Sequence, residues 1–220
     1  MLVAIVPVKL LAGAKTRLAP YLTPRQRRAL VLAMLEDVLA TLRQVPDIAQ
    51  TLVVTRDADA AALARRLGAL VVEDTAADIN GALTLGARAA LVQGARSVLA
   101  LPADVPLATA GELRRLIHTA GDARGVALVA AHDGGTAAIV MRPPLVIPYQ
   151  FEGQSAARHR LAAAAAGLPV ALVRAPGLAQ DIDRIEDLDL LAQPGVGLAS
   201  ADYLQSLEET TEFVCVGAYV

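Results

Sequence analysis

Residues 101–107 read LPADVPL and directly follow the apolar run SVLA at 97–100. This run predicts a short buried strand, because its apolar side chains leave no polar face for water. Pro102 ends the strand, and Asp104 is the first ionisable group beyond it. Ligands bind beyond the carboxyl ends of the strands in an open parallel sheet, so a carboxylate here is suited to hold a divalent cation against phosphate. Two alternatives stay open: Asp104 caps the following helix, or it lies in a hydrated loop.

Strands and helices alternate along the first two thirds of the chain. Apolar runs predict strands at 2–8, 51–55, 70–72 and 97–100, and helical spacing predicts helices at 25–42, 60–67, 82–93 and 110–120. Runs at 126–130 and 136–141 flank an Asp-Gly turn and predict a hairpin, followed by helix 156–166, strand 169–173 and a final helix at 185–191. The fold class predicted is α/β, with a mostly parallel central sheet and helices on both faces.

The composition bounds the class of protein. A chain of 220 residues with 55% hydrophobic and 19% charged residues fits one folded domain over 1–220, with a core at 1–193 and a C-terminal tail at 194–220. The formal net charge of -2 gives no reason to expect nucleic-acid binding. The single cysteine excludes an intrachain disulfide. No basic segment precedes the first apolar run and no run is long enough for a membrane span, so we expect a cytoplasmic protein.

A loop at 11–18 follows the first strand and carries Gly13, Lys15 and Arg17. It matches neither the P-loop pattern nor GxGxxG. The two cations can still donate hydrogen bonds to a triphosphate, and the guanidinium is suited to bidentate contact. The alternative is an ordinary basic surface loop.

The stretch QDID at 180–183 contains a pair of carboxylates. In an extended chain Asp181 and Asp183 face the same side, while Ile182 faces the core. Two carboxylates on one face repel each other unless a cation lies between them. Together with Asp104 they could hold one or two Mg²⁺ ions. The alternative is a capping pair for the next helix, which suits Asp183 but not Asp181.

The stretch FEGQSAARH at 151–159 has the character of an anion site at a helix start. Gly153 and Ser155 can present backbone amides and a hydroxyl to an anion, and Thr136 at the hairpin could add a second hydroxyl. We interpret His159, a lone histidine on a helix, as structural. No Ser/His/Asp set or HExxH pattern is found.

Five segments in order resemble the 2-phospho-L-lactate guanylyltransferase family, which makes a precursor of coenzyme F-420. They are VPVKLLAGAKTRLAP, RRALVLAMLEDVLATL, DINGAL, LPADVPL and DIDRIEDL. The similarity runs from about residue 2 to 191. The resemblance implies a Rossmann-like nucleotidyltransferase fold, similar to that of the molybdenum-cofactor guanylyltransferases.

The resemblance also implies a reaction: GMP transfer from GTP to a small phosphorylated acid, with release of pyrophosphate. It implies that Asp104, Asp181 and Asp183 hold magnesium, and that Thr136 and Ser155 hold the acid's phosphate. The family's phosphate-binding glycine is replaced by Glu152, with Gly153 one residue later. The asparagine that follows the family's threonine is Ala137, and its threonine-proline after the aspartates is Arg184-Ile185. The acceptors left open are 2-phospholactate, phosphoenolpyruvate and 3-phosphoglycerate.

In the mechanism expected, Lys15 and Arg17 stabilise the departing pyrophosphate, and Asp78 and Asn80 line the nucleotide side of the site. Two other functions stay open: a nucleotidyltransferase with a different phosphorylated acceptor, or a non-catalytic GTP-binding regulatory protein. The apolar, β-prone end FVCVGAYV at 213–220 either completes a sheet or covers a partner subunit, and of these two we favour a homodimer.

Overall fold

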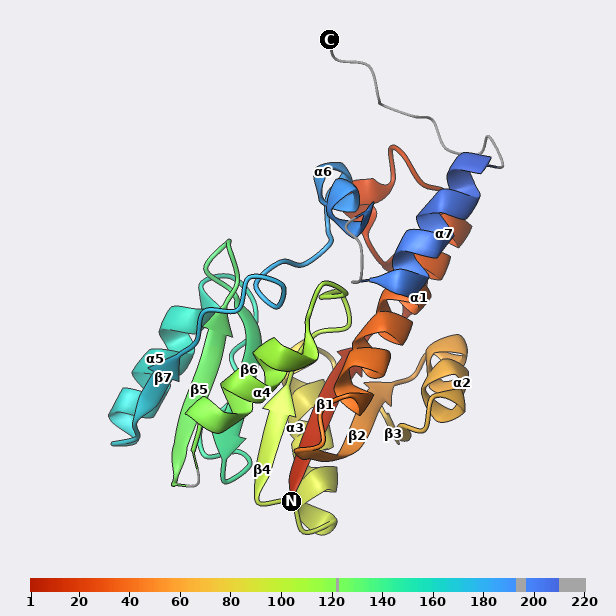
Figure 1. Ribbon diagram of the computed structural model, residues 1–220. Helices are drawn as coiled ribbons and strands as arrows, with labels where there is room; N and C mark the ends of the chain where they lie inside the picture. Colours follow the sequence, from red (N-terminus) through yellow and green to blue (C-terminus); the bar gives the residue numbers. More distant parts are fainter. Residues whose placement is uncertain (122, 193–196, 210–220) are drawn as a thin grey trace.

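The computed structural model describes residues 1–121, 123–192 and 197–209. Its centre is a seven-stranded sheet with the order β3-β2-β1-β4-β6-β5-β7 (Figure 1). The strands are β1 (Leu2–Val8), β2 (Ile48–Thr55), β3 (Leu70–Glu73), β4 (Ser97–Ala100), β5 (Gly125–Ala130), β6 (Thr136–Arg142) and β7 (Val170–Leu172). Among the strands of the described residues, only β6 runs antiparallel to its neighbours. The predicted α/β class, the mostly parallel sheet and the β5–β6 hairpin are confirmed.

Helices cover both faces of the sheet. One face carries α1 (Pro24–Arg43), α2 (Ala58–Arg66) and α4 (Ala110–Thr119), and the other carries α3 (Ile79–Val92) and α5 (Ser155–Ala165). Two further helices, α6 (Ile185–Leu188) and α7 (Leu198–Glu209), follow β7 in the chain. Alternate residues of β1 point to opposite faces, as the pleat of a strand requires. Leu2, Ala4, Val6 and Val8 pack in a core with α1, α2 and α4. Val3 and Ile5 pack in a second core with α3 and α5.

The helix starts follow the capping residues in the sequence. Thr23 caps α1 in a reciprocal capping box with Gln26, and Pro24 occupies the first turn, as predicted. Asp57 accepts hydrogen bonds from the first amides of α2. Thr109 and Glu112 form the same kind of box at α4, so Asp104 is not the cap of that helix.

Several boundaries differ from the prediction. β2 begins at Ile48 rather than at residue 51, and α3 begins at Ile79, directly after its cap Asp78. The predicted final helix at 185–191 is divided between α6 and a 3₁₀ turn, Asp189–Ala192.

A further helix, α7, follows it and lies beside α1 (Figure 1). The buried carboxylate of Asp37 in α1 accepts hydrogen bonds from the amides of Ala199 and Ser200 and from the Ser200 hydroxyl. A side chain from α1 therefore caps α7, so residues 198–209 of the expected tail are a helix packed on α1. The apolar end at 213–220 lies outside the described residues. No described helix has both the length and the apolar character needed to cross a membrane.

Candidate active site

The carboxyl ends of the parallel strands β1 and β4 lie at one edge of the sheet. The start of β6 reaches the same edge, because β6 pairs antiparallel with β4 and Ala100 lies opposite Ile139. The segments that follow β1 and β4 and the segment that precedes β6 therefore meet there. This is the edge where an open parallel sheet binds its ligands.

Segment 177–183 crosses the LPADVPL segment at this edge. The amide of Ile182 donates a hydrogen bond of 3.0 Å to the carbonyl oxygen of Asp104. The side chain of Ile182 is fully buried, as predicted. At Gly177 the two segments are so close that a Cβ atom would lie 2.3 Å from the carbonyl oxygen of Leu107. The backbone thus brings the aspartates before α6 to Asp104.

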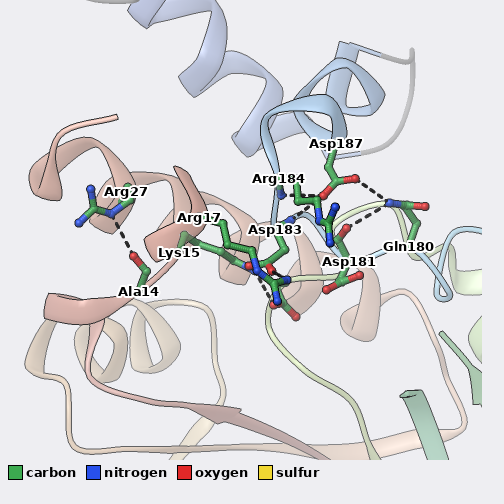
Figure 2. Close-up of polar contacts among 10 residues, drawn as sticks. Ala14, Lys15, Arg17, Arg27, Gln180, Asp181, Asp183, Arg184 and Asp187 are labelled. Carbon is green, nitrogen blue, oxygen red and sulfur yellow. Dashed lines mark hydrogen bonds and ion pairs between the residues drawn. The ribbon is translucent and has the colours of Figure 1, made fainter. Parts of the chain in front are cut away.

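Lys15 lies between two of these aspartates. Its ammonium is 2.6 Å from Asp104 Oδ2 and 3.5 Å from Asp183 Oδ1. Arg17 also forms an ion pair with Asp183. Figure 2 shows Lys15 and Arg17 pointing toward Asp183. We call Asp104, Asp181 and Asp183 the carboxylate cluster. The structure brings its charges together with the two predicted cations, which argues against an ordinary basic surface loop.

The electrostatics of the cluster show close coupling between its groups. Burial raises the pKa of Asp181, and the charge of Asp104 raises it further. Burial alone would lower the pKa of Lys15, but Asp104, by its charge and hydrogen bond, and then Asp183 together raise it. Lys15 is therefore held as a cation, and the cluster still carries enough negative charge to hinder ionisation of Asp181.

These residues suit a magnesium ion by their chemistry. Carboxylate oxygens are ligands that Mg²⁺ prefers, and a divalent charge would offset the repulsion that raises the pKa of Asp181. Among the described residues no preformed group of three or more His, Cys, Asp or Glu is arranged to hold a metal. The position between Asp104 and Asp183 is instead taken by the Lys15 ammonium.

Contacts that the sequence analysis did not predict shape the loop that carries Lys15. Arg27 of α1 donates hydrogen bonds to the carbonyl oxygens of Ala14 and Leu22. Asp57 accepts from the amide of Leu11. Lys15 itself adopts a left-handed backbone conformation with φ 50°. An arginine in a helical pattern gives no signal of contacts with the loop that precedes the helix.

The start of α6 excludes the capping alternative for Asp183. Asp187 Oδ2 accepts hydrogen bonds from the amides of Asp183 (2.9 Å) and Arg184 (2.7 Å). Asp187 therefore satisfies the start of this helix. The carboxylate of Asp183 is free of that role and faces the two cations.

Thr136 and Ser155 also meet, as predicted for a phosphate site. The Ser155 hydroxyl donates to Thr136 Oγ1 at 3.1 Å, and both residues are buried. The amide of Ser155, which was expected to face an anion, instead donates to the carbonyl oxygen of Gly153. Gly153 has φ +48°, and Glu152 has φ 97°, a conformation that favours glycine. Glu152, which stands where the family has glycine, thus has a positive φ of the kind that glycine adopts most easily.

Asp78 and Asn80 join α3 to its surroundings. Asp78 Oδ1 accepts from the amide of Gly81, and its carbonyl oxygen accepts from Lys9 at 2.7 Å. Asn80 exchanges two hydrogen bonds with the backbone of Phe151, at 2.7 and 3.3 Å. These hydrogen bonds connect the start of α3 to Lys9 and to the backbone of Phe151. A contact of Asp78 or Asn80 with the nucleotide stays a prediction.

The fold defines a class of protein. A solved nucleotidyl transferase from Methanothermobacter thermautotroptrophicus superposes with a TM-score of 0.66 at 18% identity, covering 94% of this chain and 99% of the other. At that identity the likeness concerns the fold, which is that of nucleotidyltransferases.

The particular family follows from the sequence. The model of the family described as guanylyl transferase CofC like matches residues 2–217. A phosphoenolpyruvate guanylyltransferase of Roseiflexus sp. (strain RS-1) is 43% identical over 193 residues, which are 87% of this chain and 86% of the relative. A protein of the same name from Sphaerobacter thermophilus is 40% identical over 201 residues, 91% of this chain and 97% of the relative. The chain belongs to the CofC-like guanylyl transferase family and is a nucleotidyltransferase.

Proposed function

We propose that this enzyme transfers GMP from GTP to the phosphate of a small phosphorylated acid, with release of pyrophosphate. Phosphoenolpyruvate is the first candidate acceptor, because relatives about 40% identical over most of their length carry that name. The product would be a guanylylated acid that serves as a precursor of coenzyme F-420. The observation that carries the proposal is the contact of Lys15 with Asp104 and Asp183 at the ligand-binding edge of the sheet.

The nucleophile needs little activation by the protein. A phosphate monoester loses its second proton near pH 6, so its oxygens are already anionic at neutral pH. Attack on the α-phosphorus of GTP forms one P–O bond and breaks the bond to pyrophosphate. Catalysis then depends on positioning and on neutralisation of charge. A general base is not required, in line with the structural interpretation of His159.

The carboxylate cluster and the two cations would have different roles in neutralising charge during this reaction. Asp104, Asp181 and Asp183 would hold Mg²⁺. A bound Mg²⁺ supplies charge neutralisation and a template for the phosphate oxygens. Lys15 and Arg17 would turn from the aspartates to the β- and γ-phosphates of GTP and stabilise the departing pyrophosphate. Thr136 would donate a hydrogen bond to the acceptor's phosphate.

The test is pyrophosphate release by the purified protein with GTP and Mg²⁺. Phosphoenolpyruvate, 2-phospholactate and 3-phosphoglycerate are supplied separately, with a reaction lacking acceptor as the control. We expect release that depends on one acceptor, phosphoenolpyruvate first. Binding of GTP with no release for any of the three would refute the proposal and favour a different acceptor or a regulatory GTP-binding protein.

A further inference from the structure

Three buried polar side chains form a chain of hydrogen bonds beneath the predicted phosphate site. His159 of α5 lies with its Nδ1 2.9 Å from Thr136 Oγ1, at the start of β6. Its Nε2 lies 2.9 Å from the backbone nitrogen of Gln150. The Ser155 hydroxyl donates to the same Thr136 oxygen at 3.1 Å. His159 and Ser155 are fully buried and Thr136 nearly so.

The partners of His159 determine where its proton lies. A backbone N–H can only donate, so Nε2 is the unprotonated nitrogen that accepts from Gln150. In a neutral imidazole the other nitrogen then carries the proton, and Nδ1 donates to Thr136. Burial first, and the nearby charge of Arg158 second, lower the pKa of His159 to about 4, so the ring is neutral at neutral pH.

Counting hydrogen-bond donors and acceptors in the same way determines the role of the Thr136 hydroxyl. Its oxygen has two lone pairs, and these accept from His159 Nδ1 and from the Ser155 hydroxyl. The hydroxyl's own proton is left to be donated to a third group. Thr136 begins β6 at the ligand-binding edge of the sheet, where an anionic ligand would supply an acceptor.

We propose that His159 is a positioning residue, which fixes the Thr136 hydroxyl as a hydrogen-bond donor to the acceptor's phosphate. The inference rests on the proposed function, since it deepens the account of that site. His159 does not touch the reacting atoms and is not a catalytic residue. Its effect should fall on the phosphorylated acid and not on GTP.

Two matched substitutions separate this role from simple packing. The amide of an asparagine reaches about as far as Nδ1 of a histidine, so His159→Asn can still donate to Thr136. The amide of a glutamine reaches about as far as Nε2, so His159→Gln can keep the Gln150 contact while losing the donation to Thr136. Both remove the ring and leave a cavity of similar kind.

The KM for the phosphorylated acid and the KM for GTP are measured for the wild type and both variants, and the changes in the two constants are compared. We expect His159→Gln to raise the KM for the acid about tenfold, as for a weakened hydrogen bond to a charged ligand, with the KM for GTP changed less than about twofold. His159→Asn should restore most of the loss. In a Thr136→Val background, His159→Gln should have no further effect on the KM for the acid. Equal losses in both His159 variants, or an unchanged KM in His159→Gln, would overturn the inference.

The tautomer gives a second readout that requires no turnover. The chain has three histidines, so ¹⁵N spectra of the labelled imidazoles can be assigned. We expect His159 to carry its proton on Nδ1, and a proton on Nε2 would overturn the inference. Absence of wild-type turnover with every acid would overturn the proposed function as well. Wild-type turnover with an unchanged KM in His159→Gln would overturn the inference alone.

Discussion

Replacement of Lys15 by methionine tests whether this side chain is the built-in counter-ion of the carboxylate cluster. Only 8% of the Lys15 side chain is exposed, and its ammonium contacts both Asp104 and Asp183. Methionine keeps a flexible side chain of similar length and removes the charge. In Lys15→Met the cluster keeps its negative charges and loses the cation between them.

The magnitude follows from the contact distances. At 2.6 Å and an effective dielectric constant of about 20, the attraction between Lys15 and Asp104 is about 6 kcal/mol before the cost of desolvation. Removing one partner of a fully buried pair destabilises a protein by about 3–5 kcal/mol. Asp104 and Asp183 are 29% and 26% exposed, so water screens part of the repulsion left behind. We therefore expect Lys15→Met to lose about 2–3 kcal/mol of unfolding free energy.

The assay is urea unfolding in EDTA and again with Mg²⁺. Arg66→Met is the control, because the Arg66–Glu36 pair is exposed and should contribute less than about 1 kcal/mol. Mg²⁺ should stabilise Lys15→Met more than the wild type, since the ion would enter the place of the ammonium. A Lys15→Met protein as stable in EDTA as Arg66→Met would refute the counter-ion role.

Three further predictions concern the fold. Asp37→Ala should lose about 1–3 kcal/mol in urea unfolding, because it leaves buried amides at the start of α7 without their acceptor; an unchanged stability would contradict the cap. Folding lowers the pKa of His159 from 6.5 to about 4, so the neutral ring should contribute fully to the free energy of unfolding above pH 6.5 and lose this contribution as the pH falls from 6.5 to 4. Urea unfolding at several pH values should show this loss in the wild type and not in His159→Asn. Gly86→Ala should lose about 1–3 kcal/mol, since its Cβ would lie 2.5 Å from Ile5 Cγ2; Gly111→Ala in α4, where the nearest atom is 4.0 Å away, should change stability little and toward a gain. Equal losses in both glycine variants would refute the packing argument.

The periodic parts of the chain were predictable because their signals are local. The buried run of β1, the Thr23-Pro24 start of α1 and the Asp-Gly turn between β5 and β6 each express a pattern within a few residues. The grouping of Asp104 with Asp181 and Asp183 could also be anticipated, since two carboxylates on one face of the chain repel each other unless a cation lies between them. The ion pairs of Lys15 and Arg17 then connect residues up to 166 positions apart.

The parts that sequence reasoning missed depend on distant partners. Helix α7 lies in the segment expected as an acidic tail, and its start is satisfied by Asp37, 162 positions earlier. The hydrogen bonds of His159 arise from two other elements, so a lone histidine in the sequence could be interpreted only as structural. Its contact with Thr136 gives it a place beside the predicted phosphate site.

The most direct test of the central claim is the kcat of Asp104→Asn with GTP, phosphoenolpyruvate and Mg²⁺, beside the exposed control Asp202→Asn. If Asp104 belongs to the group that binds the metal and nucleotide, its substitution should raise the barrier by about 4 kcal/mol, which is about a thousandfold loss of kcat. Circular dichroism should show the same fold in both variants, and Asp202→Asn should turn over like the wild type. Near-normal turnover by a folded Asp104→Asn protein would contradict the account.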